Sequence, residues 1–88
     1  MSEMKKVSDQ ALENVVGGVT RTIHNDAVNY ANIRDDIGLN AKVLTTMKNG
    51  TKVELTGNEP IKKDGYVWYE IWINPGQRGW IAGSLIGY

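Results

Sequence analysis

The apolar and polar positions divide the chain into two parts with different periods. Before two adjacent glycines, Gly17 and Gly18, apolar residues recur at steps of three and four, which is the period of one helix face. From Val28 onward, short runs alternate between apolar and polar residues, as strands with one buried face do. The pattern therefore predicts a short N-terminal helix or a disordered tail, followed by an all-β domain.

The N-terminal stretch carries start and stop signals of a helix. Ser8 occupies an N-cap position, Val7 and Leu12 are spaced to contact each other around it, and Gly17 suits a left-handed C-terminal turn. Only about nine residues lie between these caps, fewer than the roughly 12 to 15 that an isolated helix needs in water. We expect this segment to become ordered on a partner.

Val7-Ser8, Leu12-Glu13, Val15 and Gly17-Gly18 resemble a double-glycine leader, the export signal of many bacteriocin-like peptides of Gram-positive bacteria. In that family the leader docks onto the cysteine-peptidase domain of an ABC transporter, which cuts after the second glycine. The resemblance implies a cleavage site formed by Gly17, Gly18 and Val19. It also implies four docking residues, Met4, Val7, Leu12 and Val15. The alternative is a terminal helix with a flexible linker.

Residues 19–27 have mixed polarity and no clear period, so we interpret them as a connector with a short edge strand at 20–23. The domain is expected over 28–88. Its first strand, 28–34, places Ala31 and Ile33 on one face and Tyr30 and Asn32 on the other. Residues 35–40 form a polar loop. Asn49-Gly50 then predicts a hairpin between strands 43–47 and 52–55.

The second half of the domain contains the most apolar run of the chain, residues 66–73. As a strand, it places Val67, Tyr69, Ile71 and Ile73 on the core face and Tyr66, Trp68, Glu70 and Trp72 on the opposite face. Residues 58–65 read as a long hairpin loop, and 74–76 as a turn into a strand that begins at Gly79. A helical turn over 82–85 and a closing strand over 86–88 complete a predicted small barrel or sandwich.

The domain also resembles the bacterial SH3 (SH3b) family over 28–88, through pieces in matching order: Ala31-Asn32-Ile33-Arg34, Val43-Leu44, Met47 to Val53, Trp68-Tyr69-Glu70-Ile71 and Gly79-Trp80-Ile81. The resemblance implies an SH3-like barrel of five to six short strands. It further implies a ligand groove between the first-strand loop and the long loop. The residues expected to converge there are Tyr30, Asn32, Asp35, Asp36, Trp68 and Tyr88.

Composition excludes several classes of function. Ten basic residues balance ten acidic ones, so no electrostatic argument favours nucleic acid or an anionic membrane. The apolar runs are far shorter than the roughly 18 residues that span a bilayer. The chain has no cysteine and one histidine, His24, and this leaves no nucleophile with an activating base and no metal-ligand spacing. We therefore expect no enzyme activity, no cofactor and no metal.

Binding is better supported, because a barrel of this size cannot bury both faces of its strands. Trp68, Trp72 and Tyr66 share the face opposite the predicted core, and exposed aromatic rings suit peptide or sugar ligands. We include Trp72 among the ligand-binding residues. The alternative for Trp68 and Trp72 is that they fold over the open end of the barrel as a minor core.

Together, these features predict a secreted, non-enzymatic binding module for a cell-wall peptide or another short extracellular peptide. Its cytoplasmic precursor would be exported by the peptidase-containing ABC transporter and cut after Gly18, and the product would be secreted or associated with the cell wall. A bacteriocin-like antimicrobial or signalling peptide is the first alternative. A cytosolic SH3-like protein-interaction domain is the second.

Overall fold

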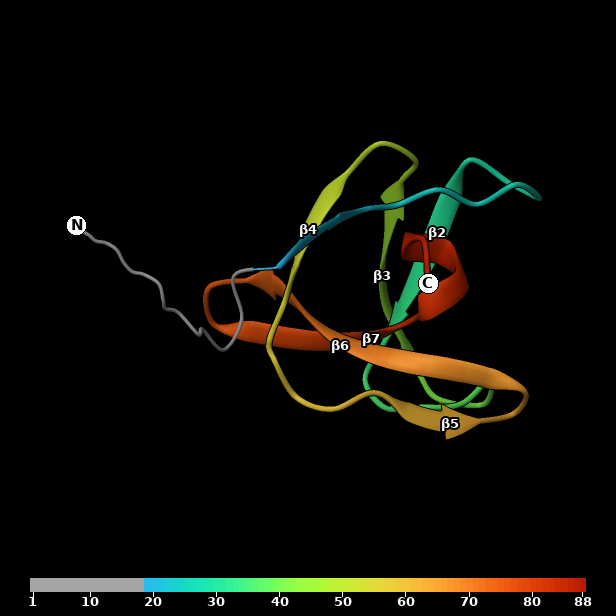
Figure 1. Ribbon diagram of the computed structural model, residues 1–88, viewed down its shortest axis with the longest axis vertical. Coiled ribbons are helices and arrows are strands. Elements are labelled where there is room, and N and C mark those ends of the chain that lie inside the picture. Colours follow the sequence, from blue (N-terminus) through green and yellow to red (C-terminus); the bar gives the residue numbers. More distant parts are fainter. Residues whose placement is uncertain (1–18) are drawn as a thin grey trace.

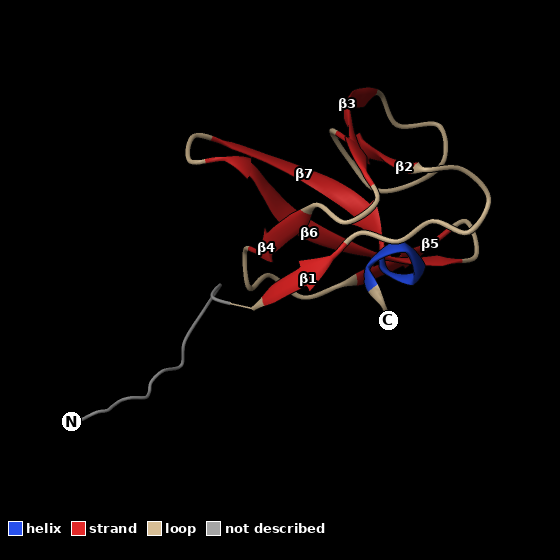
Figure 2. Ribbon diagram, turned by 90° about the horizontal axis from the view of Figure 1, so that it is seen from above, coloured by secondary structure: helices blue, strands red, loops and turns tan. Residues whose placement is uncertain are grey.

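The computed structural model describes residues 19–88, and the predictions for Met4, Val7, Leu12, Val15, Gly17 and Gly18 lie outside this range. The described part contains seven strands and one 3-10 helix (Figures 1 and 2). In chain order they are β1 (Thr20–Thr22), β2 (Tyr30–Arg34), β3 (Val43–Lys48), β4 (Lys52–Leu55), β5 (Ile61–Lys63), β6 (Tyr66–Asn74), β7 (Gln77–Ala82) and η1 (Gly83–Ile86). The all-β prediction is confirmed, with more strands than expected.

All strand pairs are antiparallel, and the order across the sheet is β1-β4-β6-β7-β2-β3, with β5 added to β6. The pair β2–β3 stands upright in Figure 1, whereas β6 and β7 run across it. The two parts meet at one register pair, Arg34 with Trp80. The sheet therefore curves back over itself as a small barrel, and η1 packs at one end.

The barrel is filled by aliphatic side chains from most of its strands. Ala31 and Ile33 of β2 are 1% and 0% exposed, which confirms the predicted core face of this strand. The remaining buried members of the core are Ile23, Val53, Ile71, Ile81 and Ile86. All buried members of this core are aliphatic. Trp68 is also almost fully buried, but it does not belong to this core.

The segment interpreted as a connector is part of the barrel. The expected edge strand is present as β1, which pairs with β4 from Thr20–Glu54 to Thr22–Lys52. Ile23, directly after β1, is completely buried in the core. The barrel thus begins before the predicted boundary at Val28. The sequence did not indicate this start, because a single apolar residue between polar neighbours produces no periodic pattern.

The predicted hairpin between residues 43–47 and 52–55 is wrong. The tight turn exists, with the Thr51 amide donating to the Lys48 carbonyl (3.1 Å) and Gly50 at φ +91°. However, β3 pairs only with β2, and β4 pairs with β1 on one side and β6 on the other. A strand has two hydrogen-bonding edges, and both edges of β4 are already taken.

Two further segments differ from the predictions. Residues 58–65 are not a loop throughout, because β5 pairs with β6 across a two-residue turn at Asp64 and Gly65, both with positive φ. No strand forms at 86–88. Residue Gly87 ends η1 in a left-handed conformation (φ 86°), and the His24 amide donates to the Leu85 carbonyl (2.8 Å). The segment after β1 is thus bonded to η1, and residues 86–88 add no strand to the sheet.

The alternation along β6 is only partly as predicted. Ile71 is fully buried, and Tyr69 and Ile73 pack against the core. In contrast, Val67, predicted to face the core, is 38% exposed, and Trp68, predicted on the outer face, is 2% exposed. Near its N-terminal end the strand therefore buries its second face at Trp68, whose indole bonds to the Lys63 carbonyl and which lies with Leu39 of the loop after β2 and Leu85 of η1 around one hollow.

Candidate functional site

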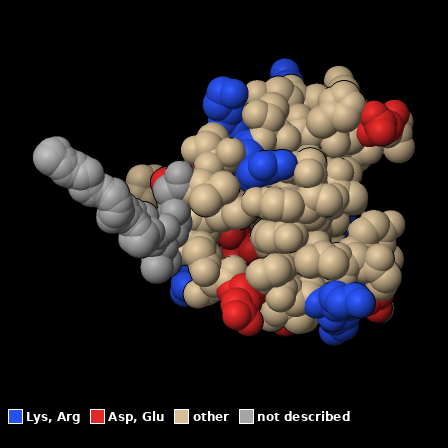
Figure 3. All heavy atoms as spheres, in the orientation of Figure 1, with Lys and Arg blue, Asp and Glu red and all other residues tan. Residues whose placement is uncertain are grey.

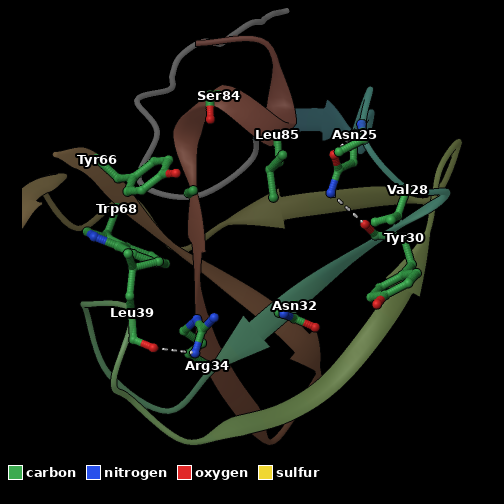
Figure 4. Close-up of a pocket in the computed structure, with 12 residues that line it drawn as sticks. Asn25, Val28, Tyr30, Asn32, Arg34, Leu39, Tyr66, Trp68, Ser84 and Leu85 are labelled. Atoms are coloured by element: carbon green, nitrogen blue, oxygen red, sulfur yellow. Dashed lines mark hydrogen bonds between the residues drawn. The ribbon is translucent and has the colours of Figure 1, made fainter. Parts of the chain in front are cut away.

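A hollow with largely apolar walls lies between β2, the loop that follows it, the start of β6 and η1 (Figure 4). Its volume is about 370 Å³, within the range of small ligand sites. In Figure 4 the side chains of Trp68 and Leu85 point toward its middle. The lining residues are Asn25, Ala27, Val28, Tyr30, Asn32, Arg34, Leu39, Tyr66, Trp68, Ala82, Ser84 and Leu85.

Trp68 gives this hollow a rigid wall. Its indole N–H donates to the carbonyl of Lys63 (2.9 Å), which satisfies the only polar atom of the ring. The ring of Tyr66 packs at an angle against it, with centroids 5.9 Å apart. Because Trp68 is only 2% exposed, it supports the hollow from beneath and holds Tyr66 in place, and the 41% exposed ring of Tyr66 is the apolar surface that a ligand can contact.

The rim on the side of β2 is shaped by Asn25. Its side-chain amide donates to the Tyr30 carbonyl (2.9 Å), and its side-chain oxygen accepts from the Ala27 amide (3.0 Å). These bonds fold the segment before β2 so that Val28 and Tyr30, 45% and 40% exposed, stand at the edge of the hollow. The rim is therefore apolar and accessible to a ligand.

The opposite rim is the loop after β2, which is fixed from two sides. The Arg34 guanidinium donates through Nη1 to the carbonyls of Leu39 (3.1 Å) and Ala41 (2.9 Å). From the side of β5, the Asp64 carboxylate accepts from the Leu39 amide (2.9 Å). Gly38 fits between these supports at φ +104°, a conformation that favours glycine. The loop thus holds Leu39 in place beside Trp68.

Three of the residues predicted for the ligand groove line this hollow, namely Tyr30, Asn32 and Trp68. Asp35 and Asp36 instead line a polar hollow on the same loop with Lys63 and Asp64. Their carboxylates also serve the loop itself. Asp35 accepts from the Lys42 amide (3.2 Å) and Asp36 from the Ile37 amide (2.7 Å). The predicted convergence of these acids with the aromatic residues is wrong.

Trp72 and Tyr88 also lie apart from this hollow. Trp72 is 38% exposed beside Lys52, Glu54 and Pro75, where the Arg78 guanidinium lies 5.9 Å from its ring centroid. It therefore neither joins the hollow nor folds into a minor core with Trp68.

Tyr88 stacks on Tyr69, with centroids 4.3 Å and planes 11° apart, and the Arg21 guanidinium lies 4.4 Å from the centroid of its ring. Tyr88 lines an apolar hollow that shares Tyr66 and Ser84 with the first. The two hollows are neighbours on one surface.

Sequence reasoning missed Arg34, Leu39, Val28 and Leu85 as lining residues of the first hollow, whereas Tyr66 lies there as a member of the predicted accessible aromatic face. Leu39 and Val28 are large apolar residues in polar segments, and this isolation was a signal that went unused. Arg34 was noted only as part of a motif. Leu85 carried no signal, because nothing in a local sequence shows which strand end a short helix will cover.

Charged side chains do not define the site. Basic and acidic groups are interspersed on the face shown in Figure 3. His24 is exposed and pairs with Asp26 (2.8 Å), as expected for a surface histidine.

Within residues 19–88, no three histidine, cysteine or acidic side chains are grouped as metal ligands would be. The described residues also include no helix with the length and apolarity needed to cross a membrane.

A curved antiparallel barrel with a 3-10 turn and an apolar hollow at one end defines a small SH3-like fold. The model of the bacterial SH3 domain family matches residues 29–87, and the chain belongs to this family. SH3 domains are typically non-catalytic binding modules. No curated protein and no solved structure matches the chain.

Proposed function

We propose that this protein is a secreted binding module that holds a short stretch of a cell-wall peptide in the hollow beside Trp68. The observation that carries the proposal is the concentration of exposed apolar side chains there. Val28, Tyr30, Leu39 and Tyr66, each at least 40% exposed, line this hollow. Val67 and Tyr88 continue the surface into the neighbouring hollow. A contiguous apolar patch on a small soluble domain marks an interaction surface.

The polar groups of the hollow favour a peptide over a purely apolar ligand. Asn32 is half-buried and its side chain has no hydrogen-bond partner within residues 19–88. Ser84 is exposed at the opposite rim on η1. A carboxamide and a hydroxyl can each donate and accept, as the backbone of an extended peptide requires. The aromatic and aliphatic walls would hold its small side chains.

For export, we propose that residues 1–18 act as a double-glycine leader, which a peptidase-containing ABC transporter removes after Gly18. The leader motif in the sequence supports this part of the proposal. The start of the barrel is compatible with it, since the Val19 carbonyl accepts from the Leu55 amide (2.9 Å) and β1 begins at Thr20. A cut after Gly18 would leave every strand intact.

The binding site is tested by retention of the full chain on purified Gram-positive peptidoglycan. Tyr30→Ala should weaken retention by about tenfold, because an exposed tyrosine at a site rim contributes on the order of 1 kcal/mol or more. Trp72→Ala is the matched aromatic control and should retain full binding. Loss of binding in Trp72→Ala but not in Tyr30→Ala would place the ligand at the other end of β6 and refute the proposed site.

Export is tested separately, by mass spectrometry of cells and supernatant from a Gram-positive host that expresses the chain with the transporter. The expected product is an extracellular chain that begins at Val19. A Gly18→Val variant should accumulate uncut inside the cells, because a side chain at this position blocks the narrow cleft of the peptidase. Finding only intact chain from Met1 in the cytoplasm would refute export.

A further inference from the structure

The hollow beside Trp68 contains one charged lining residue, Arg34, and no acidic one. Arg34 is half-buried at the end of β2, and Figure 4 shows its guanidinium between Leu39 and Asn32. The acids of the nearby loop do not face this hollow, because Asp35, Asp36 and Asp64 line a different one. The first hollow is therefore apolar with one positive charge.

The guanidinium of Arg34 retains unused hydrogen-bonding capacity. Nη1 donates to the carbonyls of Leu39 and Ala41, whereas Nε and Nη2 have no acceptor within residues 19–88. No carboxylate of the described residues forms an ion pair with Arg34. A partly desolvated guanidinium without a counter-ion is stabilised by any anion that reaches it. The planar group also presents its donors in a geometry that matches a carboxylate.

We infer that the hollow selects peptides that carry a carboxylate, which Arg34 binds while the neighbouring apolar groups of the peptide pack against the exposed rings of Tyr66 and Tyr30. This inference rests on the proposed function and adds the charge of the ligand. In a peptide, the carboxylate belongs either to the C-terminus or to an acidic side group. Both kinds of carboxylate offer two oxygens to the same guanidinium. The experiment therefore needs peptide probes in which each carboxylate can be neutralised separately.

The test uses the full chain and a synthetic N-acetylated stem tetrapeptide, L-alanyl-γ-D-glutamyl-L-lysyl-D-alanine, measured by titration calorimetry. This probe has one carboxylate on the glutamyl residue and one at the C-terminus. Three further probes replace one or both carboxylates by an amide. The first is amidated at the glutamyl carboxylate, the second at the C-terminus, and the third at both. Amidation of the bound carboxylate should weaken affinity by about tenfold or more, as expected for loss of a charge-assisted hydrogen bond. The single amides identify which carboxylate is bound.

Arg34 itself is a poor target for substitution, because its loss would also release the loop that carries Leu39. Asn32→Asp instead adds a carboxylate to the hollow without removing a hydrogen bond between described residues. It should weaken binding of the acidic probe by at least about fivefold more than binding of the doubly amidated probe, because both probes lose the amide donor of Asn32 but only the acidic one is also repelled. Asn74→Asp, which makes the same charge change in the β6–β7 turn and keeps the acceptor for the Gly76 amide (3.1 Å), should change neither.

The possible failures are distinguishable. Equal affinity for all four probes, with Asn32→Asp weakening the acidic and the doubly amidated probe to the same extent, overturns the carboxylate inference and leaves peptide binding intact. Absence of binding by every probe overturns recognition of stem peptides, and the inference with it. Weakening by Asn74→Asp equal to that by Asn32→Asp would show a long-range effect of net charge, and this result also overturns a contact at Arg34.

Discussion

Asn25 and Asn49 are joined by a reciprocal pair of hydrogen bonds. The Asn25 amide donates to the side-chain oxygen of Asn49 (2.9 Å), and the side-chain amide of Asn49 donates back to the Asn25 carbonyl (3.1 Å). One carboxamide thus satisfies both backbone groups of a residue distant in sequence. This pair, with the Gly50 amide donating to the Ile23 carbonyl (2.8 Å), attaches the β3–β4 turn to the segment after β1.

Replacing Asn49 with alanine should lower the free energy of unfolding by about 1 to 3 kcal/mol, because the part-buried backbone groups of Asn25 lose their partners. Urea denaturation measures this change. Asn40→Ala is the control, since Asn40 is exposed and its side chain bonds to no other described residue. Equal stability of the two variants would contradict a structural role for the pair.

The two tryptophans of β6 should respond differently to truncation. Trp68→Ala should cost about 3 to 5 kcal/mol, the usual effect of removing a buried tryptophan, whereas Trp72→Ala should cost about 1 kcal/mol or less. Trp68 is 2% exposed and Trp72 is 38% exposed. Thermal unfolding followed by circular dichroism compares them. If Trp68→Ala unfolds fully, Trp68→Phe, which keeps a ring but loses the bond to Lys63, should still fold with reduced stability.

Gly79 and Gly76 provide a matched test of packing in β7 and its turn. A Cβ at Gly79 would lie 2.6 Å from Cγ2 of Ile33 and 2.9 Å from Cδ1 of Ile73, closer than carbon atoms approach. Gly79→Ala should therefore destabilise the barrel by about 1 to 3 kcal/mol. At Gly76 the nearest atom is 3.9 Å away, and alanine should be tolerated. A melting temperature unchanged by Gly79→Ala would mean that β2 and β6 are not packed as described.

Asp64 combines a left-handed backbone (φ 55°) with the bond to the Leu39 amide. Asp64→Ala should cost about 1 to 3 kcal/mol locally and accelerate hydrogen exchange of the Leu39 amide, because it removes the acceptor and strains the turn. Asn tolerates the left-handed region and keeps an oxygen acceptor, so Asp64→Asn should preserve slow exchange. Fast exchange of the Leu39 amide in the unsubstituted protein and in both variants would show that the bond to Asp64 does not restrain the loop.

The sequence was sufficient where burial follows a simple alternation. Ala31 and Ile33 are correctly placed in the core because β2 has one buried and one accessible face. The turn at Pro75–Gly76 and the return strand β7 also follow from local signals, since β6 and β7 are joined by a short turn and pair with each other. These elements need only information from adjacent residues.

The errors arise where partners are distant. Asn49-Gly50 does reverse the chain, but whether β3 and β4 pair depends on β1 and β6, which occupy both edges of β4 and are distant from it in sequence. Alternation predicts an outer position for Trp68 because it assumes one buried face, whereas Leu39 and Leu85, both distant in sequence, lie beside Trp68 on the second face of β6. The six predicted groove residues do not converge in one hollow for the same reason. Asp35 and Asp36 bond within their own loop, and Tyr88 is held by Tyr69 and Arg21.

The order of strands across the sheet also determines how quickly the barrel can form. β1 must find β4, and β2 must find β7, each across a long intervening segment. Bringing these distant strands together costs loop-closure entropy before the stabilising contacts form. Folding should therefore take on the order of milliseconds to seconds rather than microseconds. The β6–β7 hairpin can form early from local contacts. Strand β1 is the first strand of the described chain to leave the ribosome, yet it cannot pair until β4 has also been synthesised.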